Sequence, residues 1–333
     1  MSTLESEVTP GIARRRGVAD AAPRRRVFRP ADPIFRWLTI ACGATVAVAM
    51  FALAGVLVVD SWQAITTLGL EPLRTTAWNP GGGEYGALTS LFGTFVTTLI
   101  AMTIAVPLAL AIALLLVELI HPLAGRVVGT TIEMLAAVPS IIFGMWGIFV
   151  VVPLMQKYVE PWIQESPLGR LSVFGGTPMG LGVFTAGVVL ALMILPFVTA
   201  VTRDVLRMVP QVVKEAGHGL GATTFEVMRS ISMRYALSGI AGAVFLGLGR
   251  ALGETMAVTF LIGGDVNTIP RSLFDPGTTI AATLANTFSE ATDPLHVSAL
   301  IELGLILFLI TMVFQLVAQA WLRRARRMSG SRA

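Results

Sequence analysis

The sequence predicts an all-α, polytopic membrane protein with six transmembrane helices, and three observations support this fold class. The 333 residues are 54% hydrophobic and 13% charged, with a mean hydropathy of +0.76, which is too apolar for a soluble globular domain. Six apolar runs are each near or above the ~20 residues that a helix needs to cross a bilayer. One polar stretch, residues 203–235, interrupts these runs with helix signals of its own.

The chain divides by composition into an arm, a membrane domain and a tail. Residues 1–36 are polar and rich in arginine, so we expect a disordered arm. Residues 37–322 hold the membrane domain, and residues 323–333 form a basic tail. The six predicted spans, in chain order, are residues 37–59, 91–119, 132–155, 181–202, 236–262 and 298–322.

The distribution of basic residues predicts the orientation of the chain. Nineteen lysines and arginines lie on the side that holds both termini and residues 203–235, against four on the other side. Loops rich in Lys and Arg stay in the cytoplasm, so we expect both termini there, in a multi-pass protein of the bacterial inner membrane. Since the basic residues flank the membrane and form no aromatic-interleaved patch, we expect contact with membrane lipid and no nucleic-acid partner.

The sequence lacks the residues that disulfides, thiolate metal clusters and phosphate loops require. Cys42 is the only cysteine, which excludes an internal disulfide framework and a thiolate metal cluster. The glycine-rich run 79–83 is no phosphate loop, because that motif needs Gly-Lys followed by Ser or Thr, and neither Lys157 nor Lys214 follows a glycine. We therefore expect this chain to bind no cofactor or metal and to hydrolyse no ATP by that route.

A predicted outer loop carries a short helix. Residues 274–277, Phe-Asp-Pro-Gly, form a turn that opens onto residues 278–291. There Ile280, Leu284 and Phe288 repeat every four residues, which predicts one apolar stripe. The helix either packs on the bundle or touches a soluble partner.

The polar stretch 203–235 reads as a helix, a glycine corner and a second short helix. Pro210 can open the first helix, and Gly221 can end it in the left-handed conformation. Thr223 with Glu226 three residues later predicts a capping box. The first helix carries a narrow apolar stripe, formed by Val212, Val213, Ala216 and Leu220. Such a stripe suits a groove in a partner, or else the membrane surface.

These residues resemble a known motif. Glu215-Ala216-Gly217, three residues, Gly221, nine residues and Ile231 are similar to the EAA loop of ATP-binding-cassette permease subunits. The resemblance implies that residues 203–235, the coupling loop, insert a short helix into a groove of a cytoplasmic ATPase. It implies a coupling role for each of these five residues. The chain has Met233-Arg234 where the family usually has Leu-Pro. Because this proline is absent, the second helix can continue past these residues.

The fifth predicted span contains charges. Arg250 and Glu254 are one helical turn apart, with Thr255 beside them, so the two charges could meet on one face. Such a pair contributes only ~0.2 to 0.5 kcal/mol on an isolated helix, whereas each charge near the bilayer centre costs ~2.5 to 3.5 kcal/mol. Either the pair fixes helix packing, or the guanidinium meets an anion on its way through the membrane. Composition leaves both open.

The run of residues 249–258 is similar to the signature of the PstC-like permease family of phosphate transporters, and the likeness extends over residues 86–323. It implies that Arg250, Glu254 and Thr255 lie on the path of imported phosphate. It also implies a heterodimer with a sister permease, a cytoplasmic ATPase dimer that holds ATP and magnesium, and an extracytoplasmic phosphate-binding protein. The chain would then be a transport subunit and not an enzyme.

Three alternatives stay open. The substrate could be another oxyanion, sulfate or molybdate, because a guanidinium serves any of them. The chain could be the sister permease, which carries a similar Arg-Ala-x-Gly-Glu-Thr run. A membrane-embedded enzyme could use Glu133, Glu254 or His121 as acid or base, but no Ser-His or paired-carboxylate constellation accompanies them at helical spacing.

Overall fold

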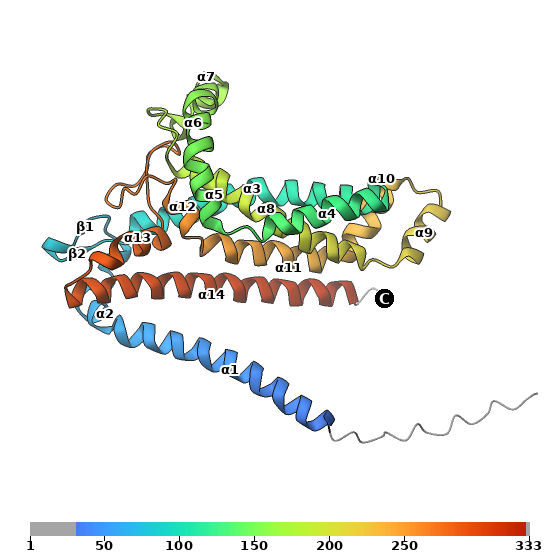
Figure 1. The fold of residues 1–333 in the computed structure, drawn as a ribbon, viewed down its shortest axis with the longest axis horizontal. Coiled ribbons are helices and arrows are strands. Elements are labelled where there is room, and N and C mark those ends of the chain that lie inside the picture. The colour runs from blue at the N-terminus through green and yellow to red at the C-terminus, as the bar shows by residue number, and fades with distance from the viewer. Residues whose placement is uncertain (1–30, 331–333) are drawn as a thin grey trace, which may run out of the picture. The chain divides into compact units, whose positions relative to one another are not determined.

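The computed structural model describes residues 31–330. The chain divides into two compact units, the first ending at Ala52 and the second beginning at Leu53. The predicted disordered arm falls mostly on residues 1–30, outside the described residues. Helix α1 (Ala31–Asp60) crosses the boundary between the units. The helices of the second unit are drawn in Figure 1.

The second unit is helical apart from a short hairpin of β1 (Trp78–Asn79) and β2 (Glu84–Tyr85). Its long helices are α3 (Leu88–Leu114), α4 (Pro122–Ala136), α8 (Val183–Arg207), α11 (Met233–Leu252) and α14 (Pro294–Gly330). Shorter ones are α2 (Trp62–Leu68), α5 (Ser140–Trp146), α6 (Val152–Leu154), α7 (Glu160–Glu165), α9 (Gln211–Gly219), α10 (Thr224–Val227), α12 (Met256–Thr259) and α13 (Ile280–Thr287). Short π-helical turns link several of them into longer rods.

Six helices within the described residues are long and apolar enough to cross a membrane, which confirms the predicted fold class. They are Pro33–Asp60, Leu88–Leu119, Ser140–Glu165, Val183–Arg207, Thr224–Leu252 and Pro294–Arg324. Helix α14 continues past the predicted end of the last span, to Gly330.

The third span differs from the prediction of residues 132–155. Helix α4 ends at Ala136, and a new helix starts at Ser140 and runs to Glu165. Pro139 separates them with an extended backbone (φ −58°, ψ 138°), because proline lacks an N–H and its ring disfavours helix at the preceding residue. The apolar run therefore contains the end of one helix and the start of the next.

The fifth span also differs from the prediction of residues 236–262. It begins earlier, at Thr224, because α10, a π-helical turn (Met228–Ser232) and α11 follow one another without a break. It ends earlier too, at Leu252. The second half of the coupling loop is thus the start of a transmembrane helix: the second helix is not short, and it continues past Met233-Arg234, as the departure from Leu-Pro allowed.

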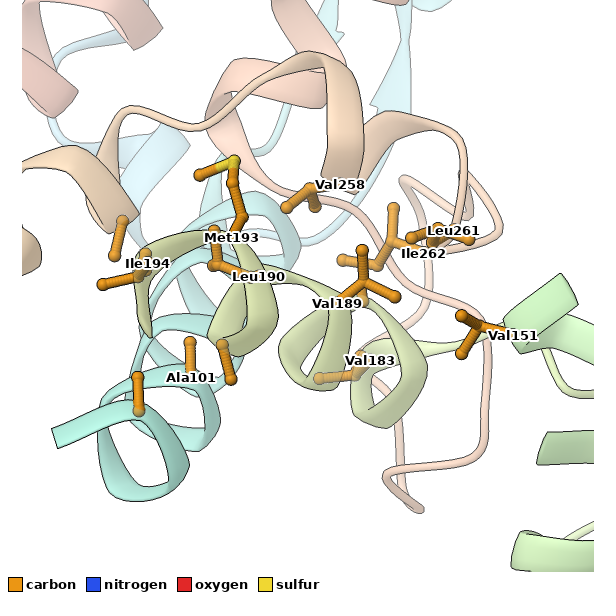
Figure 2. Close-up of a cluster of buried hydrophobic side chains, with 14 of the residues drawn as sticks. Ala101, Val151, Val183, Val189, Leu190, Met193, Ile194, Val258, Leu261 and Ile262 are labelled. Carbon is orange, nitrogen blue, oxygen red and sulfur yellow. The ribbon is translucent and has the colours of Figure 1, made fainter. Parts of the chain in front are cut away.

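Helix α8 lies at the centre of the unit, against α3, α11 and α4. The face of α3 toward this core carries Ala101, Ala105, Ala109 and Ala113, all 0% exposed and four residues apart. Small side chains at this spacing let helix backbones approach closely, which stabilises helix pairs in lipid through van der Waals contact. Figure 2 shows Val258 and Ile262 beside Val189 and Met193 of α8 in the same buried cluster.

The coupling loop and the hairpin lie at opposite ends of the bundle (Figure 1). At the hairpin end, Trp78, Tyr85 and His296 pack ring against ring, with centroids 5.4 to 6.0 Å apart. Burial, and then the charge of Asp293, raises the pKa of Tyr85. An aromatic cluster therefore packs at this end of the bundle.

Helix α13 confirms the short helix predicted within residues 278–291 and shows that it packs on the bundle. Its first turn, Ile280–Thr283, is buried. The Ile280 N–H donates to Thr94 Oγ1 (3.0 Å), and the hydroxyls of Ser90 and Thr283 lie 2.9 Å apart. Asn286 is exposed.

Candidate functional site

Helix α9 of the coupling loop has two distinct faces. Lys214 and Gly217 are buried against the bundle. Of the predicted apolar stripe, Val212 is 74% exposed and Leu220 is 91% exposed. Glu215 and Ala216 are exposed as well. Within the described residues, nothing covers the apolar stripe, so α9 presents it outward from the end of the bundle.

The corner after α9 has the predicted geometry. Gly221 adopts φ +86°, a left-handed conformation that residues with a Cβ disfavour. In the capping box that starts α10, the Glu226 N–H donates to Thr223 Oγ1 (3.3 Å) and the Thr223 N–H donates to Glu226 Oε2 (2.8 Å). The corner therefore fixes the direction of α9 relative to the helix that becomes the fifth span.

Gly217 and Ile231 meet, although they are 14 residues apart in the chain. A Cβ on Gly217 would lie 2.5 Å from Ile231 Cδ1 and 3.1 Å from Val227 Cγ2. Any larger residue at position 217 would therefore displace the Ile231 side chain from this contact between α9 and the π-helical turn. Gly217 and Ile231 of the motif thus hold α9 against the start of the fifth span, while Glu215 and Ala216 face outward.

A buried ion pair was not predicted from the sequence. Lys214 Nζ lies 2.7 Å from Glu118 Oε1, and the two side chains are only 10% and 11% exposed. Glu118 belongs to the π-helical turn (Leu115–Leu119) that ends the second span. The pair therefore ties α9 to the end of the second span. The partners are 96 positions apart in the sequence, so no local signal predicts the pair.

The three residues considered for an enzyme lie apart and hold local structure. Glu133 pairs with Arg203 of α8, which is 4% exposed and also contacts Asp204 (3.1 Å). His121 Nδ1 accepts from the Leu123 N–H (3.4 Å) at the start of α4. Glu254 caps α12. Among the residues that the structure describes, no three His, Cys, Asp or Glu side chains are grouped to hold a metal ion.

The structure places Arg250 and Glu254 on different elements. Arg250 lies in the last turn of α11, is exposed, and its guanidinium carbon is 5.8 Å from the centre of the Phe197 ring. Helix α11 ends at Leu252. Beyond it, Glu254 Oε1 accepts from the Ala257 N–H (3.3 Å), and the Thr255 hydroxyl donates to the Gly253 carbonyl (3.3 Å). The sequence spacing allowed an ion pair between Arg250 and Glu254, but the ion pairs among residues 33–324 do not include it.

The break at Gly253–Thr255 has a physical cause. Gly253 is a poor helix former, and the side chains of Glu254 and Thr255 hydrogen-bond to nearby backbone groups that a continuous helix would use. Close packing then holds α12 in place, since a Cβ on Gly144 of α5 would lie 3.1 Å from Ala257 Cα and 3.3 Å from the Met256 carbonyl oxygen. Non-helical backbone inside an apolar span is tolerated where it faces protein or a water-filled cavity.

Comparisons with known proteins show the family of the chain. Residues 105–327 match the family model described as binding-protein-dependent transport system inner membrane component. The chain is 46% identical over 278 residues to the phosphate transport system permease protein PstC of Pasteurella multocida, covering 82% of this chain and 86% of the relative. It is 44% identical over 334 residues to PstC of Mesorhizobium japonicum, covering 99% and 100%.

Two solved structures share the fold. An inward-facing MetNI methionine ABC transporter gives a TM-score of 0.51 at 18% identity, covering 72% of this chain and 94% of that chain. A bacterial alginate ABC transporter in complex with alginate pentasaccharide-bound periplasmic protein gives 0.56 at 12% identity, covering 88% and 96%. The chain therefore belongs to the family of binding-protein-dependent transport system inner membrane components, among the PstC permeases.

Proposed function

We propose that this chain is the permease subunit of an ATP-driven importer that moves inorganic phosphate across the inner membrane. The observation that carries the proposal is the 44% identity to PstC of Mesorhizobium japonicum over 99% of the chain. The exposed stripe of α9 supports it, because an importer without its own phosphate loop needs a docking surface for an ATPase.

The proposed assembly has three kinds of partner. A sister permease completes the pathway as a heterodimer, a cytoplasmic ATPase dimer holds ATP and magnesium, and an extracytoplasmic phosphate-binding protein delivers the substrate. The excess of basic residues in the terminal segments and the coupling loop supports a cytoplasmic location for the coupling loop and both termini. This chain contributes no bond-making residue and binds no cofactor of its own.

The proposed mechanism is alternating access driven through α9. ATP-driven closure of the ATPase dimer moves α9, with Glu215 and Ala216 in the ATPase groove. The Gly217–Ile231 contact and the Gly221 corner pass the movement to α11, while Lys214 passes it to the end of the second span. Arg250 lies in the last turn of α11, so a tilt of this helix would present the Arg250–Thr255 region to either side of the membrane in turn.

Uptake of labelled phosphate tests the substrate. Cells that lack their own phosphate permeases, and that carry this chain with its partner subunits, should take up labelled phosphate. A large excess of unlabelled sulfate or molybdate should leave that uptake unchanged. Competition by either anion as strong as by unlabelled phosphate would contradict the proposed substrate and favour the corresponding oxyanion.

The orientation is tested by a single cysteine at Asn286, in a Cys42→Ser background. Asn286 is exposed at the end opposite α9, so Asn286→Cys should react with an impermeant thiol reagent in intact spheroplasts. Gln211→Cys, exposed on α9, should react only after lysis. Thr283→Cys is the buried control and should stay unlabelled, because Thr283 is 0% exposed. The reverse pattern for Asn286 and Gln211 would invert the proposed topology.

Gly221→Val should uncouple transport from ATP hydrolysis while the chain still inserts in the membrane. A side chain in the left-handed conformation costs about 1 to 2 kcal/mol, which lowers the population of the native corner by about 5- to 30-fold. We expect phosphate uptake to fall by a similar factor. Gly219→Val is the control, because Gly219 also has open space around it but no positive φ. Equal uptake by both variants would show that the corner conformation is not required.

A further inference from the structure

A groove opens beside the coupling loop, at the end of two spans. It has a volume of about 300 Å³. Leu116, Val117 and Ile120 line it from the end of the second span, Pro122 and Arg126 from the start of α4, and Arg207 from the last position of α8. The groove thus combines an apolar wall with two arginines.

These two arginines differ from the buried basic side chains of the same end, Arg203 and Lys214. Arg203 and Lys214 are buried and paired with carboxylates. Arg126 and Arg207 are exposed, and no carboxylate among residues 33–324 lies within ion-pair distance of either. Two positive charges that come from different helices therefore line one groove without a counter-charge in the described part of the chain.

The position of the groove indicates what balances these charges. The second span ends at Leu119 and the fourth at Arg207, so the groove lies where apolar helix gives way to polar chain. In a membrane, this is the depth of the lipid headgroups. Basic pockets between transmembrane helices at this depth bind anionic headgroups.

We propose that the groove holds an anionic phospholipid, with its phosphate between Arg126 and Arg207 and its acyl chains along the apolar wall. The planar guanidinium donates two hydrogen bonds to one phosphate. The apolar wall, formed by Leu116, Val117 and Ile120, favours a lipid over a free inorganic phosphate, which gains nothing from apolar contact. The lipid would contact Val117, the neighbour in sequence of Glu118, which pairs with Lys214 of α9.

The test is lipid retention by the full-length chain, purified in mild detergent both alone and assembled with its partner subunits. Native mass spectrometry would follow titration with phosphatidylglycerol, with phosphatidylcholine and with inorganic phosphate. The parent should retain phosphatidylglycerol in preference to phosphatidylcholine. Arg126→Gln and Arg207→Gln should each weaken retention by about fivefold, and the double variant by more than tenfold.

Two controls separate this site from general attraction and from misfolding. Arg234→Gln removes an exposed arginine at the same end of the bundle, outside the groove, and should change retention by less than twofold. The double change Arg126→Lys with Arg207→Lys keeps both charges but loses the planar guanidinium, so its retention of phosphatidylglycerol should lie between that of the parent and that of the double glutamine variant.

Three outcomes would overturn the proposal. Unchanged retention in the double glutamine variant would show that the lipid binds elsewhere. Displacement of the lipid by excess inorganic phosphate would identify a site for a free anion. Loss of the lipid from the parent on assembly with the partner subunits would identify the groove as a protein interface.

Discussion

Lys214→Glu should abolish coupled phosphate uptake, with at least a hundredfold loss, while the chain still inserts in the membrane. The change places two carboxylates where Lys214 and Glu118 are now 2.7 Å apart and almost enclosed by protein. Removing one partner of a buried pair costs about 3 to 5 kcal/mol, enough to release α9 from the second span in most molecules. The ATPase would then keep hydrolysing ATP without driving uptake, so the ratio of phosphate moved to ATP hydrolysed is the quantity to measure.

The reciprocal change tests whether the pair itself matters. Glu118→Lys alone should uncouple in the same way, and Glu118→Lys with Lys214→Glu should recover uptake to within about tenfold of the parent, because the attraction is restored with its sign exchanged. Lys157→Glu is the matched control, since Lys157 is the other lysine of the chain and is exposed. Normal coupling in both single reversals would show that the pair does not transmit the movement of α9.

Local signals in the sequence were enough for the fold class and for the corner of the coupling loop. The length of each apolar run depends only on consecutive residues, and six runs gave six membrane-crossing helices. The left-handed Gly221 and the capping box of Thr223 with Glu226 were predicted because each depends on residues within one turn. The exposed stripe on α9 followed from helical spacing.

The errors arose where hydropathy gives no sign of a helix end. The predicted third span crossed Pro139, because the residues on both sides of the break are apolar. The predicted fifth span crossed Gly253–Thr255, because glycine is common in membrane helices and only the side-chain hydrogen bonds of Glu254 and Thr255 show that the backbone turns away.

The contacts that join α9 to the bundle depend on three-dimensional proximity. Lys214 and Glu118 are 96 positions apart in the sequence, and a lysine is seldom buried unless it is paired, so Lys214 alone gave no sign of a buried position. The close contact of Gly217 with Ile231 gives a physical reason for the glycine in the motif, which the sequence spacing alone left unexplained.

Arg250→Gln should lower phosphate uptake by about 10- to 150-fold, the factor that corresponds to losing hydrogen bonds of 1.5 to 3 kcal/mol to a charged group. Arg250 is exposed at the end of α11 and has no carboxylate partner among residues 33–324, so its charge is available to an anion. Arg250→Lys should lie between the parent and the glutamine variant, because it keeps the charge without the planar fork. Arg170→Gln, an exposed arginine of the loop after α7, is the control.

The double variant decides between a pathway and a packing role for Arg250. Because Glu254 caps α12 and does not pair with Arg250 here, the losses from Arg250→Gln and Glu254→Gln should combine without rescue, as expected for independent sites. The complex should still assemble and hydrolyse ATP, which separates a transport defect from misfolding. If Arg250 instead neutralised Glu254 in another state of the cycle, removing both charges would remove both burial costs. Near-parent uptake by the double variant would therefore defeat the pathway role and leave Arg250 as a structural charge.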